Sequence, residues 1–523
     1  MLKKVKISKI TIWLSLIVLL IVTHNMDRWG KGRVLEHDVL LYYYYVPATF
    51  IYGDLSLKFV DDDPAYFYKY FWGKKLDNGN RVNKMSMGMS FLYTPFFFIG
   101  HGAAHLLDYK TDGYSRPYQH ALGLSSIFYL ILGLFYLRRV LKRYFSEWII
   151  SFTIIAIVFA TNLFHYATDQ PAMTHVYSFA LFSIFMYKTI QWHEKQKIGT
   201  AIVIGLLTGL ISLIRPTNII IILLFVFWNV YNLTSLKEKT RLFFKKYPHI
   251  IIIMLGSFLV WLPQIIYWKM ITGSWLYYSY GDEPFYFNNS QIINGLFSYR
   301  NGWLLYTPIM IIAILGIPLL FRKIREFSWA IPLFFVINLY IVFSWWCWWY
   351  GGSFSIRALI ESYAVLAIPF ALCLKQITKI NIVLPKILIF LLIGTLYAQG
   401  ILFSIRYHYG SVHYDSMTKE AYWYSFFDIK PRSGFWPLLE KPDYFLSKQG
   451  VYEITWNKDI LEQEKDKPIK SLEYYEEKIK SEPGLLNPVI EKAKKKNIYI
   501  YEMINLDAQW YRNQDSIKYY QNK

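Results

Sequence analysis

Apolar residues recur along this chain in runs of about 20 residues, the length that crosses a membrane as an α-helix. Short polar connections separate the runs. The runs are 10–25, 118–137, 148–165, 174–190, 199–214, 217–233, 249–270, 304–320, 329–345, 358–374 and 385–405. The pattern predicts an all-α polytopic membrane protein, with a bundle of about 11 transmembrane helices.

One further apolar run, 85–107, is predicted not to cross the membrane. Basic connections favour the cytoplasmic side, and both the N-terminus, with Lys3 and Lys4, and the cluster at 138–143 are basic. A chain that leaves the cytoplasm once can return only once before that cluster. The run 85–107 should therefore be a re-entrant or interfacial helix within a long first external loop, 26–117.

The composition changes to mixed charge after residue 405. We therefore predict a transmembrane domain over 1–405 and a small external, mainly helical C-terminal domain over 406–523. Asn487-Pro488 predicts the start of a helix that ends at Asn497, and a second helix is expected over 499–510. The carboxyl end is predicted to lie outside, opposite the cytoplasmic amino end.

The composition agrees with a membrane protein, since 54% of the residues are hydrophobic and 20% are aromatic. The net charge of +20 suggests nucleic-acid binding at first, but Lys and Arg cluster in the short connections, which indicates membrane topology instead. The two cysteines provide neither a disulfide framework nor a cysteine metal cluster. The N-terminal apolar run lacks a cleavage site and is interpreted as an uncleaved anchor.

Candidate chemistry begins just after the first run, in the segment Glu36-His37-Asp38. Apolar residues recur at helical spacing over 39–51, which predicts an amphipathic helix lying on the membrane surface. Asp38 would stand at its N-terminus, at the boundary of water and lipid. The carboxylate has two interpretations there: a helix cap, or a group that acts on something presented by the bilayer.

Two arginines lie within or beside apolar runs, and each needs a partner because an Arg in a span costs about 2.5–3.5 kcal/mol. Structural pairing is favoured for Arg215, and phosphate binding for Arg357, which follows the glycine-containing GGSFS. Glu361, four residues after Arg357, is a possible carboxylate partner. The dense WWCWWYGG segment suits either a membrane interface or stacking against sugar rings.

Asp38, Asp169 and His175 are chemically able to bind a divalent metal, but no local spacing requires one. No cofactor is otherwise indicated.

Several motifs together resemble the GT-C superfamily, the membrane glycosyltransferases that use polyprenyl-phosphate sugars. HDVLLYYYYVPA is similar to the first-loop motif of protein O-mannosyltransferases and lipid A aminoarabinose transferases, and NKMSMG to the opening of a surface helix whose Lys meets the donor phosphate. Asp169 with Pro171 resembles a second-loop acid, although Gln170 stands between them. RPTN and WYGGSFSIR are similar to segments of bacterial members.

The resemblance implies a catalytic role for Asp38, with Glu36 as the open alternative and Asp169 as a second acid. It implies donor-phosphate binding by Lys84, Arg357 and Arg215. The further side chains expected to contact substrate are Tyr42, Tyr45, His175, Arg300, Trp349 and Tyr350.

The function implied is inverting transfer of a sugar from a polyprenyl-phosphate donor to a glycan, lipid or protein hydroxyl. The reaction would take place on the external face of a bacterial inner membrane. Two rivals remain open: a polyprenyl-linked glycan ligase or polymerase, and a lipid or polysaccharide transporter. A transporter is less favoured, because no inverted repeat of hydropathy is visible.

Overall fold

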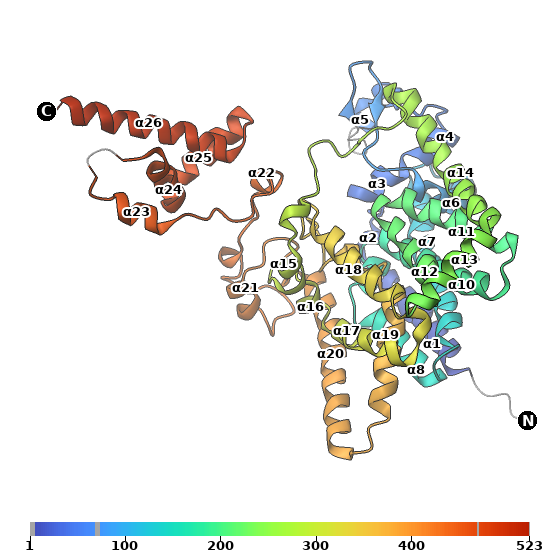
Figure 1. Ribbon diagram of the computed structural model, residues 1–523. Helices are drawn as coiled ribbons and strands as arrows, with labels where there is room; N and C mark the ends of the chain where they lie inside the picture. Colours follow the sequence, from blue (N-terminus) through green and yellow to red (C-terminus); the bar gives the residue numbers. More distant parts are fainter. Residues whose placement is uncertain (1–5, 68–73, 468–469, 522–523) are drawn as a thin grey trace, which may run out of the picture. The chain divides into compact units, whose positions relative to one another are not determined.

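The computed structural model describes residues 6–67, 74–467 and 470–521, and the chain divides into two compact units (Figure 1). Unit 1 comprises Met1–Gly281, Ser290–Ser344 and Trp348–Glu440; unit 2 comprises Asp282–Asn289, Trp345–Cys347 and Lys441–Lys523. The chain is almost entirely helical. Among the described residues the only strands are β1 (Lys74–Lys75) and β2 (Arg81–Val82), which pair antiparallel. Lys3 and Lys4 lie outside the described residues.

The N-terminal part of unit 1 holds one long helix, then short elements, then a second long helix. The elements are α1 (Ile7–His24), α2 (Asp27–Gly30), α3 (His37–Tyr43), α4 (Tyr45–Phe50), η1 (Lys58–Asp61), α5 (Pro64–Phe67) and α6 (Gly88–Leu106). The segment 39–51, predicted as one surface helix, is helical but is not a single helix. It is two short helices, α3 and α4, and every side chain from Val39 to Val46 is buried. Thr49 and Phe50 at its end are exposed, and the placement of this segment at a membrane surface stays a prediction.

The middle of unit 1 consists of helices that pack along one another. They are α7 (Arg116–Leu141), α8 (Glu147–Phe159), α9 (Leu163–Thr168), α10 (Thr174–Lys195), α11 (Ile198–Ile214), η2 (Pro216–Ile221), α12 (Ile222–Phe227), α13 (Leu233–Lys245) and α14 (Tyr247–Thr272). The most extensive pairings among these helices are α11 with α14 and α10 with α7.

The remainder of unit 1 contributes shorter helices and one long one. They are α15 (Ile292–Phe297), α16 (Trp303–Tyr306), η4 (Pro308–Met310), α17 (Ile311–Lys323), η5 (Arg325–Phe327), α18 (Ala330–Phe343), η6 (Arg357–Leu359), α19 (Tyr363–Thr378), α20 (Val383–Tyr409), α21 (Lys419–Tyr424) and η7 (Trp436–Leu438). The short helix η3 (Phe287–Asn289), which precedes them in the chain, belongs to unit 2. Helix α17 packs closely on α19: a Cβ placed on Gly316 would lie 1.9 Å from the carbonyl oxygen of Pro369.

Five helical segments in the described part of the chain are long and apolar enough to cross a membrane. They are Ile7–His24, Arg116–Leu141, Tyr247–Thr272, Arg325–Phe343 and Val383–Tyr409. Most other predicted spans are shorter helices or are interrupted, as where α8 ends at Phe159 and where Pro216 follows α11; α10, with 22 residues, is long enough but is not among the five. A membrane protein is therefore supported. The count of about 11 spans, the interfacial placement of 85–107 and the orientation of the termini stay predictions.

Unit 2 has its own small core, formed between α24 (Leu472–Ser481), α25 (Pro483–Lys496) and α26 (Ile500–Gln521), with Leu446 from α22 (Tyr444–Ser447). Helix α23 (Lys458–Glu464) packs on α24. Ile479, Val489, Ala493 and Ile504 are almost completely buried there. The Trp345–Cys347 part of the aromatic segment belongs to this unit, where the backbone amide of Trp346 donates to the carbonyl of Pro284 at 3.1 Å.

Three predictions about the C-terminal region need correction. Residues 406–440 belong to unit 1 rather than to a domain that starts at 406, because Asn301 donates to the carbonyl of Tyr414 at 2.9 Å and Phe403 packs with Met417 and Tyr422 in one buried cluster. Helix α25 begins at Pro483, with Pro488 inside it, and it ends at the left-handed Asn497 as predicted. Helix α26 runs beyond the predicted end at 510, to Gln521.

Candidate functional site

Asp38 lies in the first turn of α3 and pairs with an arginine 319 residues away. The residue that caps α3 is Glu36, in an extended conformation, so Asp38 is not the helix cap. Its carboxylate accepts a hydrogen bond from Nη2 of Arg357 at 3.0 Å. The two side chains keep 32% and 19% of their surface accessible, so a ligand can reach both.

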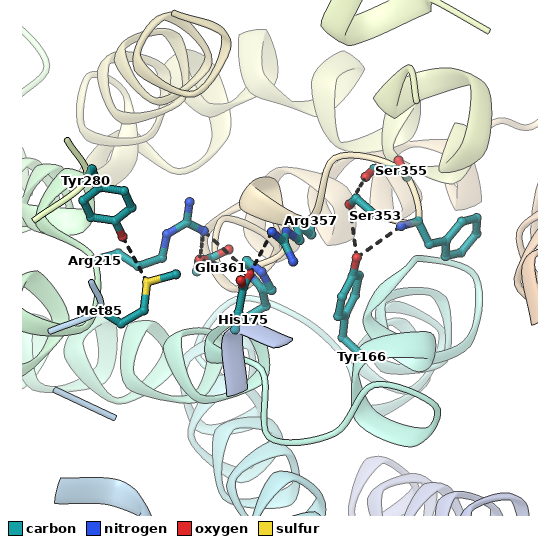
Figure 2. Close-up of polar contacts among 11 residues, drawn as sticks. Met85, Tyr166, His175, Arg215, Tyr280, Ser353, Ser355, Arg357 and Glu361 are labelled. Atoms are coloured by element: carbon teal, nitrogen blue, oxygen red, sulfur yellow. Dashed lines mark hydrogen bonds and ion pairs between the residues drawn. The ribbon is translucent and has the colours of Figure 1, made fainter. Parts of the chain in front are cut away.

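Arg215 is held by a buried carboxylate close to this pair (Figure 2). Its Nη1 donates to Glu361 at 2.9 Å, and Nδ1 of His175 lies 3.2 Å from the same oxygen. The structural pairing expected for Arg215 is therefore present. The suggested i,i+4 pairing of Glu361 with Arg357 is not: η6 ends at Leu359 and α19 begins only at Tyr363, so no continuous α-helix stacks the two side chains.

Tyr42 lies near both ion pairs. It is buried, and its hydroxyl lies within electrostatic range of Asp38, Arg215 and Arg357, and also of Tyr280. The two guanidinium groups and the Asp38 carboxylate therefore share one neighbourhood. Arg215 further lies over the ring of Tyr350, 5.9 Å from its centroid.

Lys84 is attached to the same neighbourhood through Tyr280. Its Nζ lies 5.3 Å from the centroid of the Tyr280 ring, and Ser279 donates to the Lys84 carbonyl at 2.5 Å. Figure 2 shows the Tyr280 hydroxyl directed at the sulfur of Met85, which lies 3.3 Å away. The three cations predicted to bind phosphate thus come from separate parts of the sequence to one region.

The segment before Arg357 is fixed by hydrogen bonds that the sequence did not reveal. The Tyr166 hydroxyl accepts from the backbone amide of Phe354 at 3.1 Å and contacts Oγ of Ser353 at 3.1 Å. Ser353 donates to the carbonyl of Ser355, whose φ of 53° lies in the left-handed region. These contacts set the position from which Arg357 extends (Figure 2). The only sequence signal was the small-residue composition of GGSFS.

Asp169 follows α9 and lies between two histidines rather than beside Asp38. Its carboxylate is 3.4 Å from Nδ1 of His165 and 3.5 Å from Nδ1 of His408. Burial pushes the pKa of Asp169 up, but the hydrogen bond with His408 and the charges of His165 and Arg28 outweigh this effect and lower the pKa to about 2. Asp169 is therefore ionised at neutral pH, with His165 and His408 on either side of its carboxylate.

Glu36, the open alternative to Asp38, is engaged elsewhere. It forms ion pairs with Arg33 at 2.6 Å and with Arg28 at 3.7 Å. The structure therefore gives the two acids different partners, and of the two it is Asp38 that meets Arg357.

The remaining predicted contact residues have mainly structural partners. The Tyr45 hydroxyl donates to the Met85 carbonyl at 2.7 Å, and the Tyr350 hydroxyl donates to the Val342 carbonyl at 2.9 Å. Arg300 lies 5.5 Å from the ring centroid of Trp349, which is almost fully buried. Of these four residues, Tyr350 is the one that a contact described above, with Arg215, places near Asp38.

A divalent metal held jointly by Asp38, Asp169 and His175 does not fit this arrangement. These three side chains contact Arg357, the two histidines and Glu361, respectively. Within residues 6–67, 74–467 and 470–521, no group of three or more His, Cys, Asp or Glu side chains is placed to hold a metal ion.

The arrangement is suited to binding an anion and to accepting a proton. Arg357 and Arg215 face the carboxylates of Asp38 and Glu361, and Lys84 lies against Tyr280 in the same region. Asp38 is the accessible carboxylate in the cluster, while Glu361 is only 2% exposed. Comparison with models of protein families and with curated proteins finds no match for this chain.

Proposed function

We propose that this protein is an inverting glycosyltransferase that moves a sugar from a polyprenyl-phosphate donor to a hydroxyl acceptor. The observation that carries the proposal is the accessible Asp38 carboxylate, 3.0 Å from Arg357 and in the same neighbourhood as Arg215. The two functions needed, a base for the acceptor and cations for the phosphate, thus stand side by side. The resemblance of the sequence motifs to the GT-C superfamily supports the same reaction.

The proposed reaction proceeds in one displacement. Asp38 accepts the proton of the acceptor hydroxyl, whose oxygen attacks the anomeric carbon of the donor sugar from the side opposite the phosphate. The bond between that carbon and the phosphate oxygen breaks, and its electron pair leaves with the polyprenyl phosphate. The second pKa of such a phosphate monoester is about 6, so the leaving group needs positive charge rather than an acid.

Arg357 has a double role in this proposal. A guanidinium has five N–H donors in a planar fork, and one of them is used for Asp38. The remaining donors can bind two phosphate oxygens, so Arg357 would fix the distance between the base and the leaving group. Arg215, whose Nη1 is committed to Glu361, and Lys84 would add charge around the phosphate.

The test is transfer by the purified protein in proteoliposomes, with a labelled sugar on polyprenyl phosphate. D38N should lower kcat by about 10²–10⁴-fold, the usual contribution of a positioned general base. D62N is the matched control: it removes an exposed carboxylate from the same loop and should leave turnover unchanged. R357K keeps the charge but loses the fork, and it should lower kcat/KM strongly.

Wild-type turnover by D38N would refute the proposal. A donor with a polyprenyl diphosphate, offered in parallel, separates the rival function: transfer from the diphosphate alone would indicate a glycan ligase or polymerase. Movement of the intact lipid-linked sugar across the bilayer, without transfer, would indicate a transporter.

A further inference from the structure

Helix α13, which lies far along the chain from the residues of the candidate site, has three distinct faces. An Asn232–Ser235 capping box fixes its start, and Ser235 and Lys239 form its buried face. The next face is apolar yet exposed: Leu233 is 78%, Leu236 39% and Phe244 77% accessible. An apolar face of this kind on a charged helix needs a partner.

The third face of α13 is basic. Lys237, Arg241 and Lys245 follow one another at intervals of four residues and are all exposed. No carboxylate in the described part of the chain lies within ion-pair distance of these three side chains, and α13 contains a single acidic residue, Glu238. Residues four apart line one side of a helix, so the three charges form a stripe beside the exposed apolar face.

Contacts made by the buried face determine how α13 is oriented. The Lys239 side chain is buried, and its Nζ lies 5.6 Å from the ring centroid of Trp228 and 5.5 Å from that of Phe243. Burial lowers the pKa of Lys239 to about 7. Phe243 itself lies on α13 and stacks on Phe225 of α12, with the ring centroids 5.5 Å apart, so this side of α13 packs on its neighbours while the apolar and basic faces are exposed.

The depth of α13 relative to a membrane follows from the helix after it. Helix α14 begins at Tyr247, directly after Lys246, and is one of the segments long and apolar enough to span a bilayer. Its surface is mostly exposed and apolar, as at Met254, Leu255 and Phe258. Lipid that covers this surface would end near Tyr247, so α13 lies at the level of the lipid headgroups.

We propose that α13 binds the surface of a bilayer rich in anionic phospholipid. Leu233, Leu236 and Phe244 insert among the acyl chains, and the basic stripe of Lys237, Arg241 and Lys245 contacts headgroup phosphates. A helix with adjoining apolar and basic faces is the form that interfacial helices take. The complementary charge identifies the occupant, because a neutral bilayer surface would leave three adjacent cations without counter-charge.

The experiment measures lipid binding to the full-length protein in detergent micelles by native mass spectrometry. Phosphatidylglycerol and phosphatidylcholine of the same chain length are titrated separately. We compare wild type with K237Q/R241Q/K245Q and with K465Q/K495Q/K496Q, which removes three exposed lysine charges from unit 2. Each basic residue near an anionic surface contributes about 1 kcal/mol, or about fivefold in affinity, so the α13 variant should bind phosphatidylglycerol at least about tenfold more weakly.

The wild type and the unit 2 variant should both prefer phosphatidylglycerol over phosphatidylcholine. An α13 variant that retains the wild-type preference would overturn the proposal, and so would an equal loss in the unit 2 variant. Inorganic phosphate at a matched concentration separates the two sources of phosphate. If inorganic phosphate displaced the lipid completely, the basic stripe would be a site for soluble phosphate, and the proposal that it binds a bilayer would be refuted. F244Q keeps the charges and should weaken the binding of both lipids to the same extent.

Discussion

Replacing Glu361 by Gln tests the electrostatic basis of the candidate site. The Glu361 carboxylate is 2% exposed and is shared by Nη1 of Arg215 at 2.9 Å and Nδ1 of His175 at 3.2 Å. Gln has nearly the same shape but no charge. E361Q therefore leaves the Arg215 guanidinium, which is 19% exposed, without its counter-ion.

The magnitude follows from the distance and the burial. At 2.9 Å two unit charges attract by about 1.4 kcal/mol in water and about 6 kcal/mol at an effective dielectric constant of about 20. The partial exposure of Arg215 places the pair between these limits. We expect E361Q to lower the free energy of unfolding by about 3 kcal/mol, at the low end for breaking a buried pair.

The assay is unfolding in mixed micelles with increasing sodium dodecyl sulfate, followed by circular dichroism. E453Q, which neutralises an exposed carboxylate, is the control and should leave the transition unchanged. The double variant E361Q/R215Q should lose less stability than the two single variants together, because it leaves no unpaired charge. Equal stability of E361Q and E453Q would refute the reasoning, as would strict additivity in the double variant.

Two further predictions concern other parts of the chain. G316A should destabilise the protein by about 2 kcal/mol or more in the same assay, because its Cβ would meet the carbonyl of Pro369. G394A, where a Cβ has nothing within 4 Å, should not; equal loss in both variants would contradict this account. In unit 2, the hydrogen bond from the backbone amide of Ser471 lowers the pKa of Glu464 to about 2. Its stabilising effect should be complete above the ordinary carboxyl pKa of about 4.3 and lost as the pH falls toward 2. At neutral pH the amides of α24 should exchange faster in E464Q than in wild type. This difference should disappear as the pH falls over that interval, and a difference that stays constant with pH would contradict the prediction.

The fold was predictable at the level of class and poorly predictable in detail. Long apolar runs identify membrane helices from composition alone, and α1, α7, α14 and α20 stand close to the predicted ranges. The 39–51 segment was predicted as one helix on a membrane surface, whereas it forms two short helices whose residues 39–46 are buried. Helical spacing shows which side chains are apolar, but it cannot tell whether protein or lipid covers them.

The candidate site was predictable as a set of residue types. An acid after the first apolar run and arginines beside later runs are conspicuous, since charges are costly near lipid. Their pairing was not predictable. The sequence places Glu361 four residues from Arg357, yet the backbone changes from η6 to α19 between them, and Glu361 meets Arg215 instead.

The sequence by itself determined that this protein is helical and has segments long and apolar enough to cross a membrane, because these properties depend on local composition and periodicity. Only the tertiary structure decided that Asp38 meets Arg357 and that Glu36 and Asp169 have other partners. The contacts of Asp38 with Arg357 and of Arg215 with Glu361 join residues 319 and 146 positions apart. They depend on how the helices pack around one another, and no local pattern of the chain records that packing.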